Sequence, residues 1–195
     1  MPAHPPPALG VPASRAPDRR AARTLLLAST AGTVVEWYDF FVFATAAALV
    51  FDRLFFPGAD RLAGVLLALM TYAVGFVTRP LGGLVFGVLG DRYGRKRALV
   101  WSLVLMGAAT VGVGLLPTYA VAGPLAPALL VALRLVQGLA VGGETGGAVL
   151  LVAESMPTAE RGRWTAWPQT GGPAGNVAAA GVIALVNAAV GEQAF

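Results

Sequence analysis

The sequence predicts an all-α membrane protein with about five transmembrane helices. Of its 195 residues, 56% are hydrophobic and only 12% are charged, whereas a soluble domain typically carries about 25% charged residues. A chain with so few charges cannot cover a globular surface with polar groups, which favours an integral membrane protein. The basic residues stand in short clusters between long apolar segments, the pattern of membrane loops, so the net charge of +4 does not indicate a nucleic-acid partner.

Five apolar segments have the length of about 20 residues that a helix needs to cross a bilayer. They are 25–50, 62–89, 98–116, 127–153 and 164–190. The breaks between them contain prolines, glycines or runs of charge, at 57–58, 91–97, 117–124 and 155–163. Residues 1–23 hold six prolines, which oppose helix and sheet, so we expect a disordered cytoplasmic tail before a bundle over 24–195.

The distribution of basic residues predicts that the N-terminus is cytoplasmic. Positively charged side chains are enriched in the cytoplasmic loops of membrane proteins. With the N-terminus inside, ten basic residues fall on the cytoplasmic side: Arg15, Arg19, Arg20, Arg23, Arg92, Arg95, Lys96, Arg97, Arg161 and Arg163. Only Arg53 and Arg61 fall outside.

The composition offers little for catalysis or metal binding. There is no cysteine, and the only histidine is His4 in the proline-rich tail. Metal-ligand spacing, a phosphate-cradling loop and a nucleophile elbow are all missing from the sequence. We therefore expect no enzyme activity, no catalytic residue, no metal and no cofactor.

Five charged residues interrupt the apolar segments, namely Glu36, Asp39, Arg79, Arg134 and Glu144. Each would cost at least about 2.5–3.5 kcal/mol at the bilayer centre, so such residues normally face a cavity or a partner. They indicate a polar pathway inside a helix bundle, although internal ion pairs that only orient the helices would also account for them.

Helical periodicity places most of these polar residues on shared stripes. The stripes are Gly32, Glu36, Asp39 and Phe43 in the first segment, Arg134, Gln137, Val141 and Glu144 in the fourth, and Gln169 and Asn176 in the fifth. In the second segment, Pro80 follows Arg79 and permits a kink. Glycines four residues apart predict close helix packing: Gly138, Gly142 and Gly146, Gly143 and Gly147, and Gly171 and Gly175, with a break expected at Pro173.

The loop between the second and third segments carries the most specific motif. Residues 87–97 read GVLGDRYGRKR, with Gly87, Asp91, Arg92, Gly94, Arg95 and Lys96 in register. This stretch resembles the signature loop of the major facilitator superfamily, G-x-x-x-D-R-x-G-R-[RK], and lies between the expected helices. An ordinary basic loop would explain the arginines but not the glycines and Asp91.

Three further stretches, 32–41, 79–83 and 134–147, look like the metabolite:proton symporter family of that superfamily. Its members carry shikimate, 2-oxoglutarate, citrate, proline or betaine. Thr145 departs from the aromatic residue that often follows the glutamate. The family has twelve helices in two halves, so the resemblance implies an N-terminal fragment of the first six-helix half.

The resemblance implies a proton-coupled symporter of a small organic acid or zwitterionic metabolite that works by alternating access in the inner (plasma) membrane. The candidates for proton coupling are Glu36, Asp39 and Glu144, because burial favours the protonated form of a carboxyl group. The candidates for substrate binding are Arg79, Arg134, Gln137, Gln169 and Asn176. Gly87, Asp91, Arg92, Gly94, Arg95 and Lys96 would form an inner gate. The implied partners are the metabolite, protons, lipid and the remaining C-terminal helices.

Two alternatives stay open on the sequence. The signature loop is shared with sugar carriers and drug antiporters of the same superfamily. An odd number of helices also fits a truncated, non-transporting membrane fragment, whose polar stripes would lack their facing wall.

Overall fold

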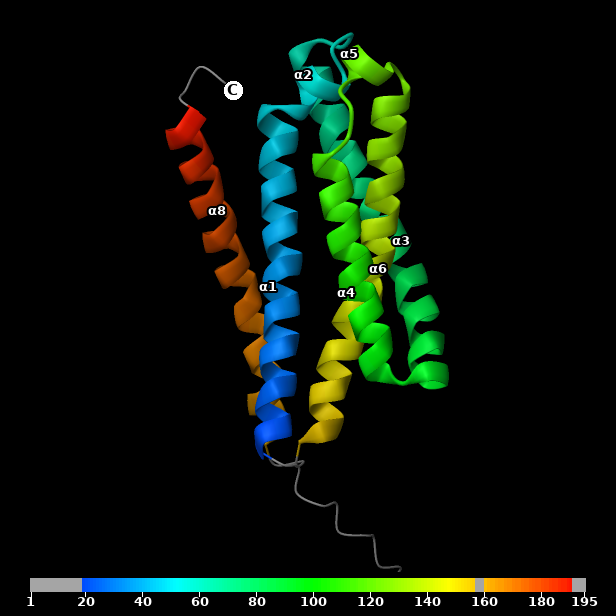
Figure 1. The fold of residues 1–195 in the computed structure, drawn as a ribbon, viewed down its shortest axis with the longest axis vertical. Coiled ribbons are helices and arrows are strands. Elements are labelled where there is room, and N and C mark those ends of the chain that lie inside the picture. The colour runs from blue at the N-terminus through cyan, green and yellow to red at the C-terminus, as the bar shows by residue number, and fades with distance from the viewer. Residues whose placement is uncertain (1–18, 157–159, 191–195) are drawn as a thin grey trace, which may run out of the picture.

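The computed structural model describes residues 19–156 and 160–190, which form a bundle of long helices standing side by side (Figure 1). The long helices are α1 (Arg19–Leu49), α3 (Arg61–Tyr93), α4 (Arg95–Gly114), α6 (Leu125–Ser155) and α8 (Gly171–Val190). Short elements connect them: α2 (Phe51–Phe55), α5 (Tyr119–Ala122), α7 (Arg161–Ala166) and the 3₁₀ helix η1 (Trp167–Thr170). The described part of the chain holds no strand, which confirms the all-α prediction.

Four helical segments of the described chain are long and apolar enough to cross a membrane: Arg61–Tyr93, Arg95–Gly114, Leu125–Glu144 and Arg161–Ala189. They correspond to four of the five predicted spans. The predicted first span forms α1, a continuous helix of 31 residues, but α1 is not among these four. Glu36 and Asp39 lower its apolar character, so its passage through the membrane stays a prediction.

The surface of the bundle fits a lipid environment. Large aliphatic side chains are widely exposed, among them Leu62 at 71%, Val77 at 71% and Leu115 at 78%. The buried core is correspondingly small. One cluster near the α2 and α5 end consists of Phe43, Ala47, Phe55, Ala68, Ala126 and Leu130. A second contains Met106, Ala140 and Val141.

Helix α6 packs closely on α3 because glycines line their contact. A Cβ atom on Gly138 would collide with the backbone carbonyl of Gly75, and one on Gly142 with that of Arg79. The Thr78 hydroxyl also donates a hydrogen bond across the contact to the Leu135 carbonyl at 2.8 Å. The packing role predicted for Gly138 and Gly142 is confirmed, whereas the surroundings of Gly146 and Gly147 lie outside the described side chains.

Helix α8 packs along α1, again through glycines. Gly171 faces Thr33 and Gly175 faces Val34 and Trp37, with no room for a Cβ atom. The predicted break at Pro173 was wrong, because α8 is continuous from Gly171. The helix is interrupted earlier, by η1 with Pro168 in its first turn. Proline is tolerated within the first turn of a helix, where the backbone N–H groups have no partner within the helix.

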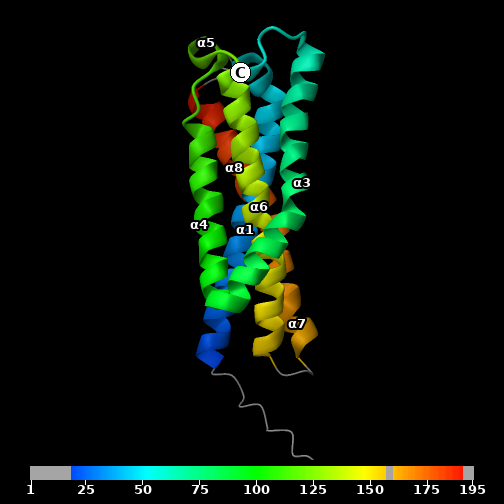
Figure 2. The same cartoon turned by 90° about the vertical axis from the view of Figure 1, so that its right-hand side faces the viewer.

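The ends of the helices bring the basic clusters together. The start of α1, the α3–α4 turn, the end of α6 and α7 lie toward the same end of the bundle (Figures 1 and 2). Helix α3 continues through Pro80 and bends along its length (Figure 2), as expected where a proline removes a backbone hydrogen bond.

Candidate functional site

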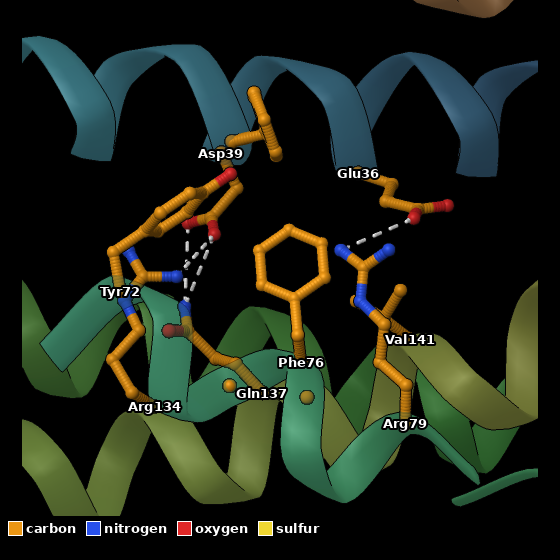
Figure 3. A pocket seen from close by; sticks show the side chains of 11 residues that line it. Glu36, Asp39, Tyr72, Phe76, Arg79, Arg134, Gln137 and Val141 are labelled. Carbon is orange, nitrogen blue, oxygen red and sulfur yellow. Dashed lines mark hydrogen bonds and ion pairs between the residues drawn. The ribbon is translucent and has the colours of Figure 1, made fainter. Parts of the chain in front are cut away.

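Three helices enclose a polar pocket about midway along the bundle (Figure 3). Its polar lining comprises Glu36 and Asp39 of α1, Arg79 of α3, and Arg134 and Gln137 of α6. Phe40, Tyr72 and Phe76 supply aromatic walls, and Gly75, Gly138 and Val141 complete the lining. The structure therefore brings five of the predicted site residues to one place, from segments up to about a hundred residues apart.

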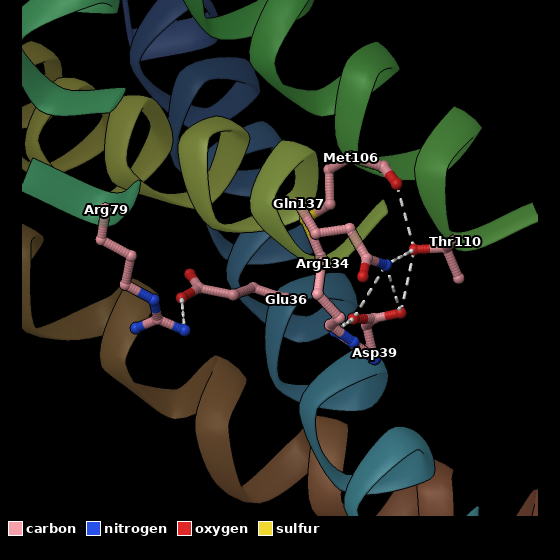
Figure 4. Close-up of polar contacts among 7 residues, drawn as sticks. All are labelled: Glu36, Asp39, Arg79, Met106, Thr110, Arg134 and Gln137. Carbon is pink, nitrogen blue, oxygen red and sulfur yellow. Dashed lines mark hydrogen bonds and ion pairs between the residues drawn. The ribbon is translucent and has the colours of Figure 1, made fainter. Parts of the chain in front are cut away.

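Asp39 and Arg134 form a buried ion pair at one end of this pocket. Arg134 Nη1 lies 3.2 Å from Asp39 Oδ2, and the two residues are 4% and 8% exposed. The Gln137 amide nitrogen lies 3.3 Å from both carboxylate oxygens. The Thr110 hydroxyl, from α4, donates to Asp39 Oδ1 at 2.9 Å (Figure 4). Donors from two helices, α4 and α6, thus satisfy one carboxylate on α1.

The Arg134 guanidinium is also held by an aromatic ring. Its central carbon lies 3.2 Å from the centroid of the Phe43 ring and 5.6 Å from that of Tyr72. A cation over an aromatic face gains electrostatic stabilisation, and more so when water is excluded. The orientation of Arg134 is therefore fixed from two sides, by Asp39 and by Phe43.

Glu36 and Arg79 form a second, looser pair at the other end of the pocket. Arg79 Nη2 lies 3.9 Å from Glu36 Oε1, and the side chains are 34% and 13% exposed. This distance exceeds the usual 2.7–2.9 Å of a charge-assisted hydrogen bond, roughly by a full ångström. The Arg79 guanidinium rests 4.3 Å over the Phe76 ring. The pair is close enough to attract but leaves Arg79 accessible to another anion.

Glu144 belongs to neither pair. It follows Arg134 by ten residues on α6, roughly 15 Å at 1.5 Å per residue. It is only 2% exposed, and its Oε2 atom has no hydrogen-bond partner in the described part of the chain. The carboxyl group fits against Gly32 of α1, where a Cβ atom would collide with Oε1. The predicted stripes on α1 and α6 therefore meet at this point.

The two amide residues of the fifth predicted span do not reach the pocket. Gln169 lies in η1 and Asn176 in α8, and both are exposed. Neither belongs to the pocket lining. Their predicted part in substrate binding stays a prediction.

The signature loop forms a tight turn between α3 and α4. Asp91 and Arg92 close α3, and Arg95 and Lys96 open α4. Between them Gly94 has φ 96°, in the left-handed region that glycine adopts without strain. Gly87, Asp91 and Arg95 line a second cavity, which extends to Gly142 and Gly143 of α6. Arg92 and Lys96 are exposed beside it.

Sequence reasoning did not assign five residues to the site: Phe40, Tyr72, Gly75, Phe76 and Thr110. Of these, Tyr72 and Thr110 carry a polar signal, a hydroxyl group in a largely apolar segment. Threonine in a helix usually bonds a carbonyl one turn earlier, as Thr110 also does with Met106 at 3.0 Å. Its second contact, with Asp39, depends on how α4 packs, and the sequence does not report that.

Comparison with known proteins agrees with this architecture. The family model described as sugar (and other) transporter matches residues 24–195. The chain belongs to this family, within the major facilitator superfamily. Its members are transporters and not enzymes, and the chain is a multi-pass membrane protein of this kind.

Three similar proteins are bacterial transporters. The inner membrane metabolite transport protein YhjE of Escherichia coli (strain K12) is 47% identical over 171 residues, covering 88% of this chain and 39% of that protein. The shikimate transporter of the same strain is 45% identical, with 89% and 40% covered. The proline/betaine transporter of Salmonella typhimurium is 43% identical, with 89% and 34% covered. No solved structure matches the chain.

The chain therefore spans about two fifths or less of the length of these relatives, and corresponds to their N-terminal part.

Proposed function

We propose that the protein is a secondary active transporter that carries a small organic acid or zwitterionic metabolite together with protons across the inner (plasma) membrane. The observation that carries the proposal is the pocket in which two carboxylates of α1 face two arginines of α3 and α6, which are long and apolar enough to cross a membrane. Charged groups at this depth are costly and mark substrate and ion pathways in membrane proteins. Alternating access then requires the missing half of the protein to move against this half.

Arg79 is the residue that we assign to the substrate carboxylate. It is the more exposed of the two pocket arginines, and its attraction to Glu36 acts over 3.9 Å. A guanidinium binds a carboxylate with two parallel hydrogen bonds, which a bound solute can form and Glu36 does not form here. Shikimate, proline and betaine, for which relatives are named, each carry one carboxylate.

Arg134 and Gln137 have a different part in the proposed site. Both are already bonded to Asp39, so they shape the pocket wall and contact the solute only at its edge. Gln169 and Asn176 join the site in a conformation where α8 faces the central pathway. That assignment rests on their spacing along one helix face.

Proton coupling is proposed for the three carboxyl groups of the spans, Glu36, Asp39 and Glu144. Moving a carboxylate out of water favours its neutral, protonated form, and each of the three is largely buried. Protons that enter along the gradient would bind one of these groups and leave on the cytoplasmic side.

The signature loop is proposed as an inner gate. Asp91, Arg92 and Arg95 stand at the end of the bundle that also carries the basic clusters, with Gly94 forming the turn between two helices. A carboxylate beside several cations can form charge-assisted hydrogen bonds with the second half of the protein. The same basic clusters support a cytoplasmic N-terminus.

Uptake measurements test the proposed function directly. Cells that express the full-length gene are given labelled carboxylates, betaines, a sugar and a cationic drug, with and without a protonophore. We expect accumulation of a carboxylate-bearing solute that the protonophore removes. Accumulation of the sugar alone would instead support the sugar-carrier alternative, since the family description includes sugars.

The same panel on the 195-residue chain decides whether this part transports alone. If the full-length protein accumulates a solute and this chain does not, although it is present in the membrane, the chain is a non-transporting fragment. Uptake by neither protein would contradict the proposed function.

A further inference from the structure

Glu144 is a buried carboxyl group of α6 that the two ion pairs leave out. Arg79 pairs with Glu36, and Arg134 pairs with Asp39. Glu144 is 98% buried, since only 2% of it is exposed, and its Oε2 atom has no hydrogen-bond partner among the described residues. A buried carboxyl group without a cationic partner is far more stable when it is neutral than when it is charged.

Gly32 closes the space around this carboxyl group. The absent side chain of Gly32 leaves room for Glu144, whose Oε1 occupies the volume that a Cβ atom would need. Leu103 of α4 also borders the same volume, 3.3 Å from that Cβ position. Helices α1, α6 and α4 therefore cover Glu144 together.

The charges that face Glu144 are few. From α1 it meets Glu36, whose carboxylate acts on it electrostatically. From α3, Arg79 is held on Glu36. Arg134, on its own helix, is held on Asp39. Helix α4 carries its charges in its first turn only, as Arg95, Lys96 and Arg97, and α8 has no charged residue.

We infer that Glu144 is the group that binds the coupled proton, and that Gly32 of α1 seals it from water whenever α1 and α6 are packed together. This inference rests on the proposed function and selects one of its three candidate carboxyl groups. The step is a proton transfer alone. Water on one side of the membrane gives the proton to a Glu144 carboxylate oxygen, and water on the other side receives it.

Glu36 connects this proton to the substrate. While Glu36 is paired with Arg79, its charge is balanced. A solute carboxylate that binds Arg79 would take away this partner and leave the Glu36 charge uncompensated near Glu144. Because like charges repel strongly in a poorly hydrated site, binding of the solute favours proton binding at Glu144. By linkage, protonation of Glu144 favours binding of the solute to the same extent.

Infrared difference spectroscopy on the purified full-length protein tests the proton site without any transport assay. A protonated carboxyl group has a C=O stretching band that a glutamine lacks. We expect a pH-dependent carboxyl band that is lost in Glu144→Gln and kept in the matched control Glu160→Gln, a change at an exposed residue outside the pocket. A band that persists unchanged in Glu144→Gln would overturn the inference. Glu144→Asp, which keeps an acid, should retain a shifted band if the site folds.

Transport in proteoliposomes separates this inference from the proposed function. The assay uses a solute that the wild type accumulates. Glu144→Gln should lose the accumulation that a proton gradient drives. Exchange of the solute between equal concentrations on the two sides of the membrane should fall less. Normal gradient-driven accumulation by Glu144→Gln would overturn the inference while leaving the proposed function intact. If the wild type accumulated no solute at all, the proposed function itself would fail.

Discussion

The two ion pairs of the pocket have the same chemistry and opposite surroundings. Asp39–Arg134 is 3.2 Å long, buried, and tied to α4 and α6 through Thr110 and Gln137. Glu36–Arg79 is 3.9 Å long, and the arginine side chain is 34% exposed. Both acids belong to one stripe of α1 and lie three residues apart. Helix α1 therefore does not explain why one pair is short and buried and the other long and partly exposed.

The difference comes from the surroundings of each pair. Arg134 points into the bundle and lies against the Phe43 ring of α1, while Gln137 of α6 and Thr110 of α4 bond its partner Asp39. Arg79 precedes Pro80 on a helix that bends, and only Phe76 supports its guanidinium. The comparison teaches that the first pair joins three helices, whereas the second is free to exchange its anion. Most of the variants below change a residue of one of these two pairs or of its surroundings.

The largest effect is expected from removing the buried acid. Asp39→Asn leaves the Arg134 charge buried without its counter-ion, which typically costs about 3–5 kcal/mol. We expect a large loss of thermal stability in detergent and loss of uptake driven by a proton gradient. Differential scanning fluorimetry and uptake into proteoliposomes measure the two effects.

The double variant Asp39→Asn with Arg134→Gln is the matched control. It removes both charges, so part of the lost stability should return, because neither charge is then left unpaired. An Asp39→Asn protein with the stability and gradient-driven accumulation of the wild type would contradict the role given to this pair.

Thr110→Val should produce a smaller effect on the same pair. The change keeps the shape of the side chain but removes the hydroxyl that bonds Asp39 and receives a hydrogen bond from Gln137. A hydrogen bond to a charged group contributes about 1.5–3 kcal/mol. Thr45→Val is a suitable control, since the Thr45 hydroxyl bonds only the Phe41 carbonyl of its own helix. Equal losses of stability in the two variants would show that Thr110 does not support Asp39.

The close contact of α3 with α6 sets the distance between the two pairs. Gly138→Ala places a methyl group against the Gly75 carbonyl and the Thr78 hydroxyl, and overpacking of this kind costs typically about 1–3 kcal/mol. Gly107→Ala on α4, with nothing within 4 Å of the added atom, should be neutral or slightly stabilising. Thermal melts of the two proteins check this, and an equal response would argue against the tight helix contact.

Sequence reasoning reached the architecture because apolar length and charge placement are local properties. It found the ends of α3 and α6 within a few residues, and the C-terminal end but not the start of α8, and it identified Gly138 and Gly142 as contact residues. It counted α1 among the spans, whereas α1 is not among the four helices long and apolar enough to cross a membrane, and Glu36 and Asp39 make it less apolar. The break near Pro173 was misplaced, since Pro168 had already interrupted the helix.

The sequence did not predict which acid pairs with which arginine. Periodicity placed Glu36 and Asp39 on one face and Arg134 and Glu144 on another, but every combination of acid and base remained open. The choice is made by packing: glycines bring α3 and α6 together, which sets Arg79 opposite Glu36 and leaves Glu144 against Gly32. Gln169 and Asn176 are the opposite example. Their spacing placed them on one helix face, but both are exposed and share no site in this structure.

The smallest change also tests the central claim most directly, namely that a solute carboxylate replaces Glu36 on Arg79. Glu36→Gln removes the competing anion, and we expect only a small loss of stability because the pair is 3.9 Å long and Arg79 stays partly exposed. Binding of the transported solute is measured by titration calorimetry on the purified full-length wild type, on Glu36→Gln and on Glu36→Gln with Arg79→Gln. The account predicts a lower Kd in Glu36→Gln and loss of that gain in the double variant. A Kd that is unchanged or higher in Glu36→Gln would contradict it.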